Sequence, residues 1–399
     1  MRDLQGIRIL HLAVVPFTIR QFVAPLMHEQ RKAGAEVAAC CAHGEFFDEV
    51  QAKGLRLIAC PMSRRLSPFH QAAAFFRLLA ILRRERPHVL HCHTPIAGLV
   101  GRLAGAWLGI PVRYYTVHGF HFHEASSWLQ RLMFVGLERA GARLGHRMMF
   151  VSSEDCDTAR KLRLAPVDRL HYVGNGVHVE HFEGAAGSIA TVQPAIPPGA
   201  HVVGYVGRMV PEKGLCELVQ AVGELRRLHG LDAHLLMVGG RLASDPPRGI
   251  AQLDALMAEA ARAGWLHATG LVPDPSPFLR LMHTFCLPSY REGLPVALME
   301  AMAAGLPCVA SRIRGCRELI AHEETGLLIE PRDASGLASA LERVARNPFL
   351  AQQLGNAARR RITDSFSFEA WIERIGTVYA LDAAAIQSIR EASENSASS

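Results

Sequence analysis

Three things that the sequence lacks narrow its function before any motif is considered. The 399 residues contain no run of about 18 uninterrupted apolar residues, so a helix that spans a lipid bilayer is not expected. The nine cysteines form no Cys-x-x-Cys pair and several lie in apolar runs, which favours buried free thiols in a reducing cytosol. No Gly-x-Gly-x-x-Gly follows the first expected strand, and a nicotinamide dehydrogenase would carry one.

Acidic residues are scarce in the first half of the chain and nearly balance the basic ones in the second. Residues 1–199 hold 23 basic and 15 acidic side chains, a difference of +8, whereas the remaining residues hold 20 and 22, a difference of −2. Such an excess favours an anionic membrane surface or an acidic substrate, although a solvated basic face would look the same. Nucleic acid is not expected as a partner, because no zinc-finger spacing or ribonucleoprotein motif accompanies the charge.

The most informative stretch of the basic first half is residues 67–86, whose pattern predicts an amphipathic helix. Its apolar residues at helical spacing are Phe75, Phe76, Leu79 and Leu82, and its basic residues are Arg77, Arg83, Arg84 and Arg86, preceded by Arg64 and Arg65. A helix of this kind can lie at a headgroup boundary with its arginines on anionic lipid. The alternative is an ordinary helix that packs on a sheet and turns its basic face to water.

Strand-like apolar runs alternate with helical patterns along the chain, which predicts an α/β fold. The expected strands are residues 7–15, 36–41, 55–59, 88–92, 112–117 and 147–151, followed by residues 202–206, 233–238, 265–268, 284–287, 307–310 and 326–329. We therefore expect two Rossmann-like domains with doubly wound parallel sheets, at residues 1–183 and 200–365. Residues 184–199 have the composition of a linker. A helix over 366–392 is free to cross back to the first domain, and residues 393–399 are expected to be disordered.

Ligands of parallel sheets bind outside the carboxyl ends of the strands, so we expect the two domains to face each other across a cleft. One motif at such an edge is Gly207-Arg-Met-Val-Pro-Glu-Lys-Gly214, which opens a helix predicted over 211–228. Arg208 and Lys213 flank its loop, and cations beside a helix N-terminus suit a diphosphate. A basic turn capped by proline would explain the proline but not the two glycines and two cations.

A second motif is Glu292-Gly-Leu-Pro-Val-Ala-Leu-Met-Glu300, which places Glu300 about two turns into a helix predicted over 295–303. The two glutamates could grip hydroxyl groups at opposite ends of an extended ligand, and the amides of Gly293 and Leu294 could meet a phosphate. The alternatives are helix-dipole stabilisation for Glu292 and a solvated helix face for Glu300.

These motifs, with GCRELI at residues 315–320 and TGLLIEP at residues 325–331, resemble the carboxyl-terminal domain of the family 4 retaining glycosyltransferases. Asn175-Gly-Val177 resembles the tripeptide that precedes that domain, and the likeness covers most of residues 170–365. The resemblance implies the GT-B fold and transfer of a sugar from a nucleotide sugar with retention at the anomeric carbon.

The same resemblance implies a role for each motif residue. Arg208 and Lys213 would hold the diphosphate of the donor, Glu300 its ribose and Glu292 its sugar, and Val272 would lie near the base. The donor would be a UDP-linked hexose or N-acetylhexosamine. No metal ion or other cofactor is expected, because cations and helix amides would stabilise the leaving diphosphate.

Three histidines in residues 116–124, at the end of a predicted strand, look at first like a metal site. No cysteine or carboxylate cluster of matching spacing completes one, so no metal is expected. Members of the resembled family carry a histidine at this strand end near the donor sugar, and His118 takes that position as an expected catalytic residue. The string around His121 and His123, together with HCHTPIAG upstream, resembles the capsular and exopolysaccharide branch of the family.

Two further features bear on this interpretation. Asp155-Cys-Asp157 has the form of the metal signature of the other large glycosyltransferase fold, but a serine before it predicts a helix N-cap with the acids in the first turn. Many relatives have a paired-glycine loop after the first strand, whereas residues 15–20 here contain no glycine.

The acceptor implied by the resemblance is a lipid-linked saccharide, carried on undecaprenol, or another saccharide. The enzyme would then be cytoplasmic and peripheral on the inner face of the plasma membrane. One rival is a GT-B sugar-nucleotide epimerase, which would need acid and base residues on both faces of the sugar. Another is a catalytically silent binding subunit of a polysaccharide assembly complex, which would have lost motif residues.

Overall fold

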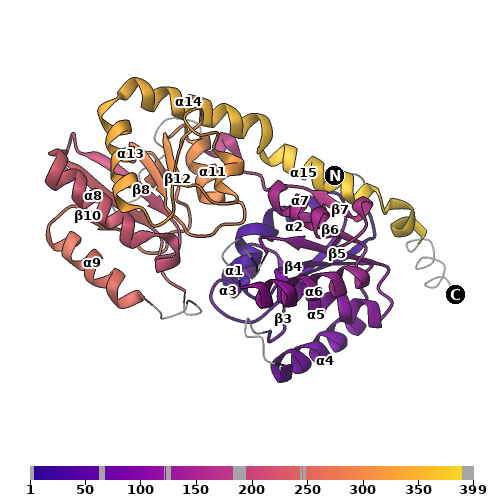
Figure 1. Ribbon diagram of the computed structural model, residues 1–399. Coiled ribbons are helices and arrows are strands. Elements are labelled where there is room, and N and C mark those ends of the chain that lie inside the picture. Colours follow the sequence, from indigo (N-terminus) through magenta and orange to yellow (C-terminus); the bar gives the residue numbers. More distant parts are fainter. Residues whose placement is uncertain are drawn as a thin grey trace. The chain divides into compact units, whose positions relative to one another are not determined.

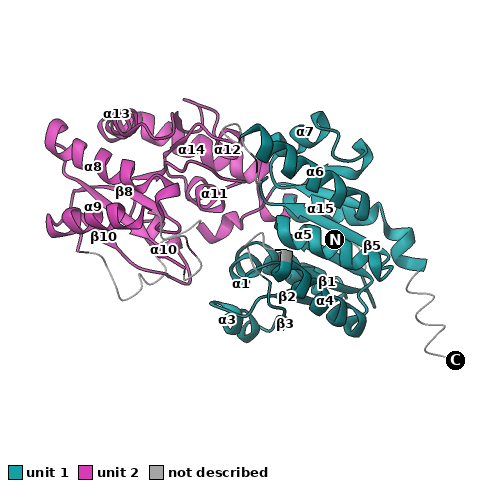
Figure 2. Cartoon of the chain, turned by 60° about the horizontal axis from the view of Figure 1, so that its bottom comes forward, with its two compact units in different colours: residues 1–174, 371–399 teal, residues 175–370 magenta. Residues whose placement is uncertain are grey.

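A computed structural model describes residues 4–62, 68–120, 122, 127–182, 195–242, 245 and 249–388 (Figure 1). The chain divides into two compact units, residues 1–174 with 371–399 and residues 175–370 (Figure 2). Several features singled out in the sequence lie outside the described residues: most of the predicted linker at 184–199, Arg64, Arg65, His121, His123 and the tail at 393–399. The predicted domain bounds therefore stay predictions.

The first unit contains a seven-stranded parallel sheet in the order β3-β2-β1-β4-β5-β6-β7. Its strands are β1 Arg8–Leu12, β2 Glu36–Cys41, β3 Arg56–Ala59, β4 Val89–His93, β5 Val112–Val117, β6 Arg147–Phe150 and β7 Leu170–Tyr172. Every residue of β4 is buried, as expected for a central strand of a sheet covered on both faces. The strand order reverses between β1 and β4, and ligands of doubly wound sheets bind at such a switch point.

Helical segments cover this sheet. In the described part of the unit they include α1 Pro16–Thr18, η1 Ile19–Val23, α2 Ala24–Lys32, α3 Phe47–Ala52, α4 Pro68–Glu85, α5 Pro95–Trp107, α6 Trp128–Leu144, α7 Ser153–Lys161, η2 Val167–Arg169 and the later part of α15 Phe368–Ala380. The side chain of Ser152 accepts the N–H of Asp155, 3.4 Å away, so α7 begins with the predicted serine cap. The acids of this segment thus lie at a helix start, with Asp155 buried and Asp157 exposed.

The second unit contains a six-stranded parallel sheet in the order β10-β9-β8-β11-β12-β13, with its switch point between β8 and β11. Its strands are β8 His201–Val206, β9 Ala233–Val238, β10 Leu266–Ala268, β11 Thr284–Leu287, β12 Cys308–Ser311 and β13 Leu327–Ile329. Its helices include η4 Pro211–Lys213, α8 Leu215–His229, α9 Ile250–Arg262, α10 Ser276–Leu279, α11 Val296–Ala303, α12 Cys316–Leu319, α13 Ala334–Arg346 and α14 Pro348–Ser365. The two sheets confirm the predicted α/β class.

Two expectations about helices in this unit are wrong. The helix predicted over 211–228 is broken in two, because Gly214 adopts a φ of 69°, in the left-handed region that interrupts a helix. The helix predicted over 295–303 is α11, Val296–Ala303, but Glu300 lies only about one turn from its start and not two, because four residues make about one turn.

The apolar face of the basic helix α4 packs inside the first unit. Leu79 and Leu82 are 5% and 2% exposed, and Phe75 packs against the same core, whereas Phe76 is 68% exposed. The headgroup interpretation is therefore wrong for three of the four apolar residues, because helical spacing of apolar residues also arises from packing on a sheet. The arginines of α4 remain on the exposed side of the helix.

Helix α6 exposes more large apolar side chains than α4 does. Five of its side chains are between 37% and 73% exposed: Trp128, Leu129, Leu132, Met133 and Leu137. Helix α5 contacts both α4 and α6, so the three helices run side by side (Figure 1). We call the exposed apolar residues of α6 the α6 face.

Candidate active site

Three loops pack against one another at the carboxyl edge of the second sheet, with their backbones in close contact. A Cβ atom on Gly214, after β8, would lie 1.9 Å from the carbonyl oxygen of Pro288, after β11. A Cβ atom on Gly315, after β12, would lie 1.9 Å from the carbonyl oxygen of Gly293. Side chains at the two glycines are thereby excluded, and the loops meet at the switch point between β8 and β11.

This meeting point holds a paired cation and carboxylate. The Nζ atom of Lys213 lies 2.6 Å from Oε1 of Glu292, and the two side chains are 17% and 12% exposed. Lys213 ends η4, and Glu292 follows β11, so the pair joins the two motifs that the sequence analysis singled out. Burial, with the Glu292 carboxylate nearby, raises the pKa of the neighbouring Cys316 thiol well above its ordinary value. Cys316 is thus an uncharged neighbour of the pair.

Arg208, the second predicted diphosphate ligand, is held by two carboxylates. One guanidinium nitrogen donates to Asp245, and another lies 3.0 Å from Oε1 of Glu212. Burial lowers the pKa of Arg208, but the carboxylates outweigh that effect, and its pKa lies above the ordinary value. A diphosphate at Arg208 would therefore compete with Asp245, a residue 37 positions away that the sequence analysis missed.

The predicted phosphate-binding amides lie just before α11. Within the described part of the chain, no acceptor is bonded to the backbone N–H groups of Gly293 and Leu294. The side-chain amide of Asn175 donates to the carbonyl oxygen of Leu294, 3.2 Å away, and fixes this loop from the Asn-Gly-Val segment. Two backbone donors thus stand ready beside the Lys213–Glu292 pair.

Glu300 is not on a solvated helix face, so that alternative is wrong. Burial, reinforced by the carboxylate of Asp274, raises the pKa of Glu300 to about 8. Asp274 in turn accepts hydrogen bonds from the N–H and hydroxyl groups of Ser276, both 2.9 Å away. Val272 is half-buried in the segment that begins at Gly270, whose carbonyl accepts the N–H of Gly239 after β9. The same edge therefore carries all the residues predicted for the nucleotide.

His118 lies in the first unit, directly after β5. Burial lowers its pKa to about 4, so the imidazole is neutral at physiological pH. Its Nε2 atom is 3.2 Å from Nδ1 of His93, and its ring centroid is 5.2 Å from that of Phe22. The Nδ1 atom of His118 is buried and has no hydrogen-bond partner among the described residues. A buried nitrogen of this kind is available to a ligand.

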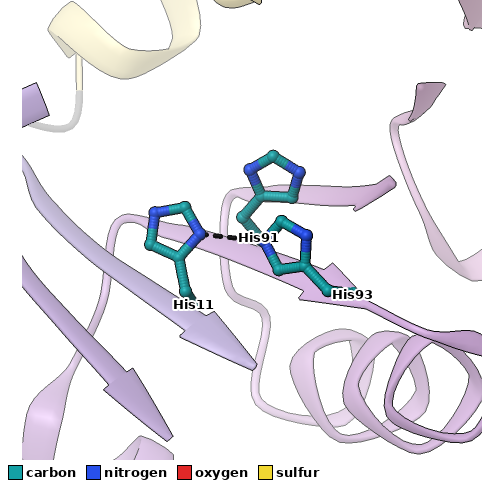
Figure 3. Close-up of side chains that lie close together, drawn as sticks. All are labelled: His11, His91 and His93. Atoms are coloured by element: carbon teal, nitrogen blue, oxygen red, sulfur yellow. Dashed lines mark hydrogen bonds between the residues drawn. The ribbon is translucent and has the colours of Figure 1, made fainter. Parts of the chain in front are cut away.

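Other histidines lie around His118, and the sequence motifs assigned them no role in the site. His91 and His93 alternate along β4 and share one face of the sheet, and His11 pairs in register with His91 across β1 and β4 (Figure 3). The spacing of His91 and His93 was visible in the sequence, but their meeting with His11 depends on the strand order. A group of neutral, hydrogen-bonded histidines thus lies at the switch point of the first sheet.

Two parallel α/β units, with a half-buried cation and carboxylate pair at the switch point of the second, are the architecture of the GT-B class. Residues 18–176 match the Glycosyl transferase 4-like domain, and residues 200–347 match the family Glycosyl transferases group 1. The chain belongs to this family, the group 1 or family 4 glycosyltransferases.

Relatives and solved structures agree with that assignment. The capsular polysaccharide biosynthesis glycosyltransferase CapM of Staphylococcus aureus is 24% identical over 93% of this chain and 96% of its own length. An Escherichia coli UDP-Gal:alpha-D-GlcNAc-diphosphoundecaprenol alpha-1,3-galactosyltransferase is 27% identical over 80% of this chain and 81% of its own length. The fold resembles that of Anabaena HepE, crystallised with UDP and glucose, with a TM-score of 0.79 and 16% identity over 94% and 100% of the two chains. These comparisons confirm the predicted GT-B fold, and CapM is a distant relative from the capsular branch that the sequence resembles.

Among the described residues, no helix combines the length and the apolarity that crossing a membrane requires.

Proposed function

We propose that this chain is a retaining, metal-independent glycosyltransferase that moves a hexose or N-acetylhexosamine from a UDP-sugar to a lipid-linked saccharide during cell-surface polysaccharide biosynthesis. The observation that carries the proposal is the Lys213–Glu292 pair beside the free amides of Gly293 and Leu294 at the switch point of the second sheet. Relatives that act on undecaprenol-linked acceptors support the acceptor, and HepE in complex with UDP supports the donor.

The chemistry follows from the charge that develops as UDP leaves. Lys213, Arg208 and the two amides stabilise the diphosphate, in the place that a metal ion takes in other transferases. Glu292 holds the donor sugar and keeps Lys213 in position. His118, neutral and in the other unit, orients or polarises a donor hydroxyl, or its backbone carbonyl accepts developing charge. The acceptor attacks on the face that UDP leaves, through an oxocarbenium-like state.

The test is a screen of UDP-glucose, UDP-galactose and their N-acetylamino counterparts against a prenyl-diphosphate-linked sugar, with and without a chelator. We expect one donor to give UDP and a product one sugar longer, at the same rate in both conditions. Epimerised UDP-sugar without transfer would overturn the proposal in favour of an epimerase. Loss of activity with chelator, restored by manganese, would overturn the metal-independent mechanism.

The raised pKa of Glu300 predicts that UDP binding depends on pH. At pH 7 its carboxyl group is mainly protonated in the free protein, whereas accepting two ribose hydroxyls requires the carboxylate. As the pH falls from 8.5 to 7, the Kd for UDP should rise, by at most roughly tenfold per pH unit. Calorimetric titration checks this. The Glu300→Gln variant should show no such dependence, and Asp274→Asn should shift it to lower pH. An equal Kd for the wild type at both pH values would contradict the role of Glu300.

For the lipid-linked acceptor we place the membrane contact on the α6 face and the arginines of α4. Trp128, Leu129 and Leu132 suit the headgroup boundary, and Arg83 and Arg84 are exposed on α4. Basic residues near an anionic surface contribute about 1 kcal/mol each and are screened by salt.

Cosedimentation with anionic vesicles should therefore detect binding that weakens as salt rises. The double variant Trp128→Ser, Leu132→Ser and the triple variant with Arg83, Arg84 and Arg86 changed to Glu should each lose most of it. Phe349→Ser is the matched control, because Phe349 is 69% exposed on α14 of the other unit. Equal binding by all four proteins would place the membrane contact on another surface, and no binding by the wild type would move the acceptor towards soluble saccharides.

A further inference from the structure

A continuous line of buried hydrogen bonds leads from helix α2 to His118. Oε1 of Gln30 lies 2.7 Å from Nε2 of His11, and Nδ1 of His11 lies 3.0 Å from Nε2 of His93. Nδ1 of His93 then lies 3.2 Å from Nε2 of His118. Figure 3 shows the His11–His93 contact within the histidine cluster. Gln30, His11 and His93 are each at most 2% exposed, so water does not compete for these groups.

A second branch starts from the other end of the Gln30 amide. Nε2 of Gln30 donates to the hydroxyl of Tyr379 on α15, 3.0 Å away. That hydroxyl lies 2.9 Å from Nδ1 of His91, and Nε2 of His91 lies 2.7 Å from the hydroxyl of Thr116. Since the amide nitrogen of Gln30 is used as a donor here, its oxygen is left to accept from His11.

Each imidazole in the line carries one proton, because burial makes all of them neutral. Burial lowers the pKa of His11 to about 4 and that of His93 well below its ordinary value. A neutral ring has one donor and one acceptor nitrogen, so the direction of each hydrogen bond fixes the direction of the next one. Gln30 accepts from Nε2–H of His11, Nδ1 of His11 accepts from Nε2–H of His93, and Nδ1 of His93 accepts from Nε2–H of His118.

We propose that Gln30, His11 and His93 are positioning residues that hold His118 as its Nε2–H tautomer, so that its Nδ1 lone pair accepts a hydrogen bond from a hydroxyl of the bound sugar. The unpartnered, buried Nδ1 of His118 is the end of the line. The identity of that hydroxyl group rests on the proposed function, whereas the tautomer does not. A reversed Gln30 amide would reverse every donor and leave Nδ1–H on His118, a donor in place of an acceptor.

The same histidines do not favour a metal site. Ligand atoms of His11, His91 and His93 lie within 4.8 Å of one another, but all six ring nitrogens already have hydrogen-bond partners. The rings of His91 and His93 are stacked with centroids 4.4 Å apart, which does not aim two lone pairs at one ion.

Nitrogen NMR of protein labelled with ¹⁵N-histidine reads the tautomer directly, and His118→Gln identifies the His118 signals by their loss. We expect a protonated Nε2 and an unprotonated Nδ1 in the free wild-type protein. In Gln30→Met, which keeps the volume but removes the acceptor, His118 should populate both tautomers. A wild-type His118 protonated at Nδ1, or a Gln30→Met spectrum like that of the wild type, would overturn the inference.

Kinetics give a second, independent readout. His93→Phe should lower kcat roughly five- to tenfold with little change in the donor KM, since about one neutral hydrogen bond is lost. His234→Phe is the matched control, because His234 is 4% exposed and its Nδ1 lies 2.9 Å from Nε2 of His267 in the second unit, outside both branches of the network. Its kcat should stay within about twofold of the wild type. Circular dichroism and melting temperature verify that both variants fold. If His93→Phe does not fold, the Gln30→Met variant is assayed in its place.

The outcomes separate this inference from the proposed function. Full activity of His118→Ala would overturn the role of His118 in transfer, while the NMR result would still decide the tautomer. An inactive His118→Ala beside a fully active His93→Phe would overturn the positioning line alone. Stoichiometric zinc binding that His91→Phe abolishes would assign the cluster to a metal centre and contradict the line.

Discussion

Replacing Lys213 by alanine is expected to lower kcat/KM for the UDP-sugar by about 30- to 1,000-fold, equal to about 2–4 kcal/mol of transition-state stabilisation. The change removes a cation from the leaving diphosphate and leaves the Glu292 carboxylate unpaired in the same place, 12% exposed. Both effects raise the energy of a transition state that gathers negative charge. Arg208→Ala should act in the same direction but leaves Asp245 and Glu212 without their common partner.

The matched control is Lys53→Ala, which also removes a Lys–Glu pair. The Nζ atom of Lys53 lies 2.8 Å from Oε1 of Glu49, but this lysine is 58% exposed and in the first unit. Steady-state kinetics of the three variants, with melting temperatures as a folding check, complete the test. Near-wild-type turnover in both Lys213→Ala and Arg208→Ala would show that the diphosphate is stabilised elsewhere.

Lowering the pH from 7.5 to 5 is expected to destabilise the first unit strongly. Burial lowers the pKa of His11 and His118 to about 4 and that of His91 and His93 well below the ordinary 6.5. Below pH 6.5 the unfolded chain therefore binds protons that the folded chain does not. The contribution of these histidines to the free energy of unfolding is fully present above about pH 6.5. It falls as the pH drops towards 4, by up to about 1.4 kcal/mol per pH unit for each histidine.

Urea unfolding at a series of pH values, followed by near-ultraviolet circular dichroism, measures this slope. His91→Phe should reduce it by about one histidine's share, or about 1.4 kcal/mol per pH unit. His43→Gln changes a histidine whose side chain is 66% exposed and should leave the slope as it is. A wild-type stability that does not change between pH 7.5 and 5 would mean that these histidines are accessible to protons in the folded protein.

Most of the fold could be predicted from the sequence, because its central strands are uninterrupted apolar runs. Strands β2, β5, β9 and β11 match their predicted bounds to the residue. Short or locally ambiguous elements, such as the three-residue strand β7 and helix α3, were not predicted from the sequence. The break at Gly214 also escaped, although a glycine is the residue that most readily adopts the left-handed φ of 69° found there.

The residues of the candidate site likewise divide into those that a local motif predicts and those that only the fold brings together. Lys213, Glu292, Glu300 and His118 lie in local motifs with a chemical logic, and the motifs picked them out. Asp245 could not be found in this way, because its pairing with Arg208 joins two loops that only the folded sheet brings together. The histidine line likewise depends on β1 lying next to β4, and no local spacing contains that information.

Membrane contact shows the limit of amphipathic patterns. The same spacing of apolar residues appears in a helix that packs on a sheet and in one that lies on lipid. The pattern of α4 therefore predicts a membrane-facing side that in the structure packs in the core. The apolar side chains of α6 that reach solvent are of the same residue types as those in the core. Only the packing of each helix distinguishes them.

The configuration of the transferred sugar tests the central claim most directly. Product isolated from the preferred UDP-sugar and a prenyl-diphosphate-linked acceptor would be analysed by proton NMR for the coupling between the protons on C1 and C2 of the new sugar. Starting from an α-linked UDP-hexose, a retaining transferase gives an α-linked product, and that is the result expected. A β-linked product would contradict retention, and a donor consumed without any glycosidic product would contradict transfer itself.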